Sequence, residues 1–125
     1  MGHAASPAHQ FRCDVEATLS VIGGKWKILL IWFLIEEERR FSAFRRQFPE
    51  ITQKVLTQQL RELEADGIVR REIFPQVPPK VEYSLTEFGR SLLPVMSAID
   101  RWGRGNMERL VALRHERQPD AVAAE

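Results

Sequence analysis

The sequence predicts a mainly α-helical domain that carries one small β-hairpin, and three observations support this fold class. Short helical patterns fill the first half of the chain, and the Phe48-Pro49 pair interrupts them. Two stretches rich in β-branched and aromatic residues, 68–74 and 80–85, flank the sequence PQVPP, as in a hairpin with a proline-stiffened tip. A long helical stretch follows, to about Leu113. This order of elements is that of a winged helix-turn-helix domain.

The first two predicted helices precede the basic part of the chain. Residues 14–22 form the first helix, with Asp14 as its N-cap, and the glycine pair at 23–24 ends it. Residues 25–35 form the second helix, which is apolar nearly all round. Such a helix must be covered on more than one side. We expect the three-helix core on one side, and a partner subunit or the C-terminal helix on the other.

The third predicted helix is short and ends at Pro49. Phe41 begins it, and Ser42 is the residue that could cap it. Its aromatic residues recur at helical spacing and should face inward, at positions 41, 44 and 48. Arg45 and Arg46 then face outward.

The fourth predicted helix runs from Thr52 to about Ala65. Thr52 is a suitable N-cap, and Gly67 suits the left-handed position that follows a helix end. One buried stripe along the helix consists of Leu56, Leu60 and Leu63.

The last predicted helix begins after a Thr86-Glu87 cap. Pro94 and the glycines at 103 and 105 should kink or divide it. One apolar face carries Leu92, Met96 and Ile99. We expect a folded domain over residues 11–113, with disordered tails at 1–10 and 114–125.

A basic segment from Arg39 to Arg61 carries the main functional signal. It holds six basic residues and one acidic residue, so its net charge is +5 in a chain whose total is +1. A local positive field in a near-neutral protein favours a surface that binds a polyanion. The field covers the helices on both sides of Pro49, so the second of them could enter a DNA major groove.

The helix at 52–65 is polarised in charge along its length. It has no acidic residue from Thr52 to Arg61, whereas Glu62, Glu64 and Asp66 follow. The helix dipole prefers the opposite arrangement, so a phosphate backbone near the N-terminal end is the simplest explanation. A solvated polar face is the alternative. Glutamine can bond adenine in a bidentate manner, lysine or arginine can bond guanine, and the threonine methyl can touch thymine. The DNA-contacting candidates on this helix are Thr52, Gln53, Lys54, Thr57, Gln58 and Arg61.

Cations outside this helix suit contacts with the DNA backbone. Arg45 and Arg46 precede the helix and should bind phosphate. The hairpin adds Arg70, Arg71 and Lys80, with Lys80 nearest the tip. Their alternative role is salt bridging to Glu72 and Glu82 across the strands.

Other functional classes find little support. The histidines at 3, 9 and 115 lie in the expected tails, and no metal or cofactor motif is present, so we predict neither an enzyme nor a metal site. The longest apolar run has eight residues, whereas a membrane helix needs about 20. Cys13 is the single cysteine, which excludes a disulfide framework within the chain, and we expect a cytoplasmic protein.

Several segments together resemble the HxlR-type winged-helix transcriptional regulators, a branch close to MarR-like repressors. The resemblance covers roughly residues 11–103. The matching segments are the opening from Cys13 to Ile22, GGKW at 23–26, RRFSAFRRQFPEITQKVLTQQLRELEADGIV at 39–69 and VPPKVEYSLTEFGRSLLPVM at 77–96, ending in Trp102-Gly103.

The resemblance implies a homodimer that binds a pseudo-palindromic double-stranded DNA operator and regulates transcription, most simply as a repressor. It places the dimer contacts in the first and last helices, where the apolar surface includes Leu92, Met96, Ile99 and Trp102. A winged-helix module that binds another protein is the alternative function.

The resemblance also implies a small thiol-reactive or apolar effector. Some relatives sense oxidants through a cysteine near the N-terminus, where this chain has Cys13. Asp14 stands where proline is frequent, and an adjacent carboxylate slows the reaction of a thiol. A small buried packing residue is the alternative for Cys13, and we favour it slightly.

Overall fold

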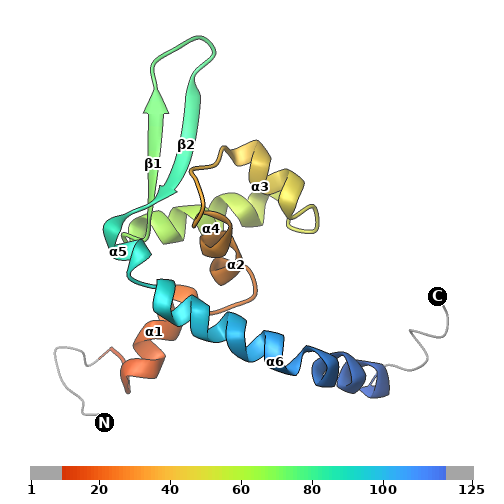
Figure 1. Ribbon diagram of the computed structural model, residues 1–125. Coiled ribbons are helices and arrows are strands. Elements are labelled where there is room, and N and C mark those ends of the chain that lie inside the picture. The colour runs from red at the N-terminus through yellow and green to blue at the C-terminus, as the bar shows by residue number, and fades with distance from the viewer. Residues whose placement is uncertain (1–9, 118–125) are drawn as a thin grey trace. The chain divides into compact units, whose positions relative to one another are not determined.

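The computed structural model describes residues 10–117, which divide after Leu92 into two compact units (Figure 1). The first unit contains α1 (Asp14–Ile22), α2 (Lys27–Phe33), α3 (Phe41–Gln47), α4 (Gln53–Ala65), the strands β1 (Val69–Phe74) and β2 (Lys80–Leu85), and the short α5 (Glu87–Arg90). The second unit is the helix α6 (Leu93–Arg117). The predicted class, mainly α with one antiparallel hairpin, is confirmed.

The core of the first unit lies between α2, α4 and the base of the hairpin. Helix α4 contacts both α2 and β1, and α3 contacts β2. The leucine stripe predicted for α4 is buried, together with residues of α2 and the start of β1: Leu30, Ile31, Leu56, Leu60, Leu63, Ile68 and Val69. Burial of each such side chain contributes about 1.5–3 kcal/mol, so this stripe fixes which face of α4 remains exposed.

Aromatic rings connect α2, α3 and β2 within the same core. The ring of Phe44 meets that of Phe33 edge-on at a centroid distance of 5.3 Å and that of Tyr83 at 5.9 Å. Phe48 also packs edge-on against Phe33, at 5.6 Å. Edge-to-face pairs of this kind add about 0.5–1.5 kcal/mol each beyond simple burial. The hairpin is therefore tied to α3 through its second strand.

Helix α4 has the ends that the sequence predicts. The Thr52 hydroxyl accepts a hydrogen bond from the backbone N–H of Val55 at 3.1 Å, which satisfies one of the unpaired donors of the first turn. Gly67 follows the C-cap residue Asp66 with φ +76°, a left-handed conformation that glycine adopts without strain. Both ends of the candidate recognition helix are therefore sharply defined.

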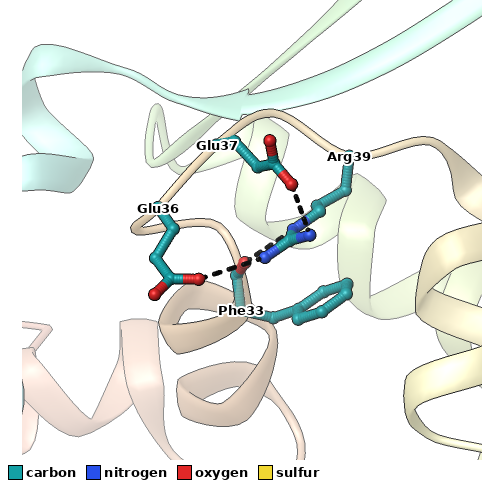
Figure 2. A network of polar contacts seen from close by, with 4 residues as sticks. All are labelled: Phe33, Glu36, Glu37 and Arg39. Carbon is teal, nitrogen blue, oxygen red and sulfur yellow. Dashed lines mark hydrogen bonds and ion pairs between the residues drawn. The ribbon is translucent and has the colours of Figure 1, made fainter.

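A short segment before α3 supports the base of the hairpin. The backbones of Arg39 and Tyr83 exchange two hydrogen bonds, of 2.9 and 2.8 Å, beside the paired strands β1 and β2. The Arg39 guanidinium turns back to the end of α2, where it donates to the Phe33 carbonyl and pairs with Glu36 and Glu37 (Figure 2). The charged turn therefore links α2 to the hairpin, and Arg39 is internally neutralised.

Several predicted helix boundaries were wrong. Helix α1 begins with Asp14 itself, and the N-cap is Cys13, which makes no side-chain capping bond. Ser42 lies inside α3, whose N-cap position is Arg40. The second helix is shorter than the predicted 25–35 because Trp26 and Leu34 are its caps. Local residue type alone did not decide these ends.

The long C-terminal helix also differs from the prediction. Helix α6 continues through the glycines at 103 and 105, and it reaches Arg117, beyond the predicted end at Leu113. Pro94 is the second residue of α6, where its missing N–H costs nothing, so it stands at the start of the helix rather than inside it. Of the expected tails at 1–10 and 114–125, residues 1–9 and 118–125 lie outside the described residues, and residues 114–117 belong to α6 instead of a tail.

Candidate nucleic-acid interface

The outward face of α4 holds the predicted base-reading residues. The side of the helix opposite the buried leucines carries a shallow hollow of about 800 Å³, lined by Gln53, Lys54, Thr57, Gln58, Arg61, Glu62 and Ala65. All of its lining residues belong to α4, so it is an open surface rather than an enclosed pocket. Gln53, Lys54, Gln58 and Arg61 are exposed, and Thr57 is partly buried. The structure therefore brings these predicted contacts onto one accessible face.

Helix α3 contributes a cation at the N-terminal end of this face. The Nη1 atom of Arg45 donates a hydrogen bond to the Oε1 atom of Gln53 at 3.1 Å. Arg45 stands in the last turn of α3, and Gln53 is the first residue of α4. The residue predicted to bind phosphate and the residue predicted to read a base are therefore in direct contact. Arg46 is also exposed.

A groove of about 360 Å³ separates α4 from the hairpin. Helix α4 contributes Gln53, Thr57, Arg61 and Glu64 to it, the hairpin contributes Arg71, Val81 and Tyr83, and α3 contributes Phe41. Burial is the main cause of a raised pKa for Tyr83, which keeps the phenol protonated and able to donate a hydrogen bond at neutral pH. Sequence analysis missed Tyr83 because its proximity to α4 depends on how the hairpin folds back.

The two arginines of β1 lie on opposite faces of the hairpin. Arg71 is paired with Tyr83 and Arg70 with Ser84, and side chains alternate between the two faces of a strand. Only Arg71 lines the groove beside α4. Within residues 10–117 neither arginine forms an ion pair, so the alternative role, salt bridging to Glu72 or Glu82, is not observed for either of them.

Lys80 is held against its own strand. Its Nζ atom lies 3.3 Å from a carboxylate oxygen of Glu82 and 4.8 Å from the centre of the Phe74 ring. Its side chain is 31% exposed. The sequence ranked Lys80 ahead of the two arginines as a DNA contact. In the folded chain, however, Lys80 is the one of the three that already forms an ion pair.

A second missed pair lies at the C-terminal part of the α4 face. Lys27 Nζ, from the first turn of α2, lies 2.7 Å from Glu62 Oε1, and Gln58 Nε2 donates to Glu62 Oε2 at 3.2 Å. The hydrogen bond from Lys27 is the main cause of a lowered pKa for Glu62, and the bond from Gln58 adds to it. The carboxylate is therefore ionised at neutral pH. The 35-residue separation of Lys27 and Glu62 hid this contact from sequence analysis.

Cys13 is exposed in the single chain. The slightly favoured interpretation, a small buried packing residue, is therefore wrong for the protomer as it stands. Cys13 has an extended backbone at the start of α1, and its carbonyl accepts the bond from Ala17 N–H at 3.1 Å.

The second unit displays apolar surface along α6. Ile99 is 50% exposed and Trp102 62% exposed, whereas Met96 is already buried within the protomer. The other large exposed apolar side chains of α6 are Val95, Met107, Val111 and Leu113.

Residues 10–117 contain no cluster of three or more metal-ligating side chains. Nor does any helix in that range have the length and apolarity needed to cross a membrane.

The comparisons with known proteins identify the family. The model of the HxlR-like helix-turn-helix family matches residues 21–111. The chain belongs to this family. It is 59% identical over 102 residues to the uncharacterized HTH-type transcriptional regulator YybR of Bacillus subtilis, covering 82% of each chain. Together with the fold, this makes it a helix-turn-helix regulator of transcription.

Solved structures agree with this assignment. The redox regulator HypR in its oxidised form has 62% identity and a TM-score of 0.73, over 75% of this chain and 97% of that one. The reduced form of HypR has 59% identity and a TM-score of 0.75, over 78% of this chain and 97% of that one. A Porphyromonas gingivalis W83 regulator assigned to the MarR family has 32% identity and a TM-score of 0.72, over 83% and 99%.

Proposed function

We propose that this protein is a homodimeric repressor that binds a pseudo-palindromic operator in double-stranded DNA. The carrying observation is the exposed face of α4, which has no carboxylate from Gln53 to Arg61 and lies beside a groove lined by Arg61 and Arg71. In this proposal α4 enters the major groove and the hairpin follows the adjacent backbone. A regulator that binds chromosomal DNA acts in the compartment that holds the chromosome, so the proposed location is the cytoplasm.

The proposed contacts fall into two groups. Base contacts are made by side chains on the exposed face of α4, namely Gln53, Lys54, Thr57, Gln58 and Arg61. Phosphate contacts come from Arg45, Arg46 and Arg71, together with the N-terminus of α4 capped by Thr52. Arg70 and Lys80 have secondary roles, because one lies on the other face of the hairpin and the other is ion-paired.

Equilibrium binding to duplexes at several salt concentrations tests this function. A DNA-binding protein that neutralises several phosphates loses affinity steeply and log-linearly as salt rises. We expect a steep slope and a sequence preference at fixed salt. A protein-docking module, the alternative function, would bind duplexes weakly and without sequence preference.

The proposed homodimer rests on the exposed apolar side chains of α6 and of α1. Val15 and Leu19 of α1 are more than half exposed, as are Met107 and Trp102 of α6. Large apolar side chains exposed along a helix are candidates for burial against a partner. Sedimentation at micromolar concentration should give the dimer mass, and a recognition-helix separation of about 34 Å would match one turn of DNA.

We also propose that thiol oxidation regulates DNA binding through Cys13. Two observations favour it: Cys13 is exposed at the start of α1, and the similar protein HypR is a redox regulator. A single cysteine per chain requires either a disulfide between subunits or a mixed disulfide with a small thiol. Diamide should weaken operator binding by the wild type but not by Cys13→Ser. Unchanged binding after complete modification, checked by mass spectrometry, would refute this role.

A further inference from the structure

The two exposed glutamines of α4 differ in how their amide groups are held. A glutamine amide has an oxygen that accepts hydrogen bonds and a nitrogen that donates them. The sequence does not decide which end faces a DNA base. In this fold each amide is tied at one end to a charged neighbour, and the chemistry of that neighbour determines which end is tied.

At Gln53 the tied end is the oxygen. Its partner is the guanidinium of Arg45, whose Nη1 atom lies 3.1 Å from Oε1 of Gln53. A guanidinium has donors and no acceptor, so only the amide oxygen can face it. The amide nitrogen therefore points away from α3.

At Gln58 the tied end is the nitrogen. Its Nε2 atom donates to Oε2 of Glu62 at 3.2 Å, and an ionised carboxylate can only accept. Glu62 is itself held by Lys27, whose Nζ atom lies 2.7 Å from Oε1 and whose side chain is only 12% exposed. Lys27 belongs to α2, so the carboxylate is anchored from outside the recognition helix. The amide oxygen of Gln58 therefore points away from Glu62.

We infer that Gln53 and Gln58 have opposite, preset roles in reading the operator: Gln53 presents a donor, and Gln58 presents an acceptor. Gln53 then selects a base acceptor in the major groove, such as N7 or O6 of guanine, N7 of adenine or O4 of thymine. Gln58 selects a base donor, the amino group of adenine or cytosine. Bidentate pairing with adenine, the role expected from the sequence, would require the tied atom of either glutamine to be shared between the base and its charged partner.

This inference rests on the proposed DNA-binding function, so the experiment begins with the operator. Selection from a random duplex pool gives the preferred site for the wild type. Repeating it with Gln53→Ala and with Gln58→Ala identifies the base pairs at which each glutamine contributes preference. Single-atom base analogues are then placed at those pairs, and dissociation constants are measured for all three proteins.

Each analogue removes one hydrogen-bonding group from the major-groove edge of its base. The 7-deazapurines remove the N7 acceptor, 2-aminopurine in place of guanine removes O6, and 5-methyl-2-pyrimidinone in place of thymine removes O4. Purine in place of adenine, and 2-pyrimidinone in place of cytosine, remove the amino donor. At the Gln53 position we expect acceptor removal to weaken the wild type about five- to tenfold and to leave Gln53→Ala unaffected. At the Gln58 position we expect donor removal to weaken binding by the wild type to the same extent. Donor removal there should leave the affinity of Gln58→Ala unchanged.

A third variant tests the preset role itself. Glu62→Ala releases the nitrogen of Gln58, so acceptor removal at the Gln58 position should begin to weaken binding. Gln47→Ala is the matched control, because Gln47 is an exposed glutamine at the end of α3, outside the reading face. Gln47→Ala should show the same loss of affinity with each base analogue as the wild type. Thermal unfolding followed by circular dichroism checks that each variant is folded.

The outcomes separate the inference from the function on which it rests. A wild type without any sequence preference would overturn both. Two results would overturn the inference alone while the wild type still prefers certain sequences. In one, removal of a base donor at the Gln53 position weakens binding; in the other, removal of a base acceptor at the Gln58 position weakens it. The inference is also overturned if no analogue at either position changes the dissociation constant of the wild type, or if Glu62→Ala shows the same sensitivity to every analogue as the wild type.

Discussion

The two arginines of β1 offer a matched test of how the hairpin meets DNA. Both are exposed and lie next to each other in the chain, and within residues 10–117 both lack an ion-pair partner. Only Arg71 lines the groove beside α4, whereas Arg70 points to the other face of the hairpin. We therefore expect Arg71→Gln to weaken binding to all duplexes, and Arg70→Gln to have a much smaller effect.

The size of the effect follows from counterion release. Each phosphate contact contributes about 0.9 to the slope of log affinity against log salt, so a rise from about 50 to 200 mM salt costs about 3.5-fold per contact. A dimer loses two contacts when Arg71 is replaced. The slope should therefore fall by about 1.8, and the loss of affinity over this salt range should become about 12-fold smaller.

Fluorescence anisotropy with one labelled duplex, titrated at four salt concentrations, measures these slopes. The change in salt slope caused by Lys80→Gln should lie between the changes caused by the two arginine variants, because Lys80 is already paired with Glu82. The two arginine substitutions are at exposed positions and should each change the free energy of unfolding by less than about 0.5 kcal/mol. Equal slope changes for Arg70→Gln and Arg71→Gln would refute the placement of the hairpin face toward DNA.

Three further predictions concern stability, pH and assembly. Thr52→Ala removes the α4 cap and should lower the free energy of unfolding by about 1 kcal/mol in urea denaturation, whereas Ser42→Ala, at a position without a capping role, should change it little. The pKa of Glu62 is held below its ordinary value of 4.5, so its contribution to stability is present above that pH and is lost as pH falls through the lowered pKa. The melting-temperature difference between wild type and Glu62→Gln should be present at about pH 7 and shrink progressively as the pH falls below 4.5, and a constant difference would contradict this. Trp102→Glu should shift the sedimenting species toward monomer, because a charge then enters the proposed interface, and an unchanged dimer would place the interface elsewhere.

Local chemistry determined the elements that the sequence predicted correctly. The Thr52 cap, the leucine stripe of α4 and the left-handed Gly67 each depend on residues within one helix, and the structure confirms all three. The hairpin strands also agree closely, since two stretches rich in β-branched and aromatic residues flank the proline-rich turn. These features need no knowledge of the tertiary fold.

The missed features depend on contacts between distant residues. Lys27 meets Glu62, and Tyr83 meets Arg39 and Phe44, only after the helices and hairpin have packed. No local pattern marks either contact. The prediction that glycines 103 and 105 would kink or divide the last helix failed for a different reason: a glycine costs only about 1 kcal/mol in a helix interior, and good helix formers such as Arg104 and Met107 lie in the same stretch.

The central claim is that the exposed face of α4 reads a two-fold DNA site, and selection from a random duplex pool tests it most directly. The wild type should enrich two inverted half-sites whose centres lie about 10 base pairs apart, one turn of DNA. Gln53→Ala should lose the preference at one base pair of each half-site while keeping its affinity for random duplexes. Failure of the wild type to enrich any sequence, at a salt concentration where it binds DNA, would contradict the claim.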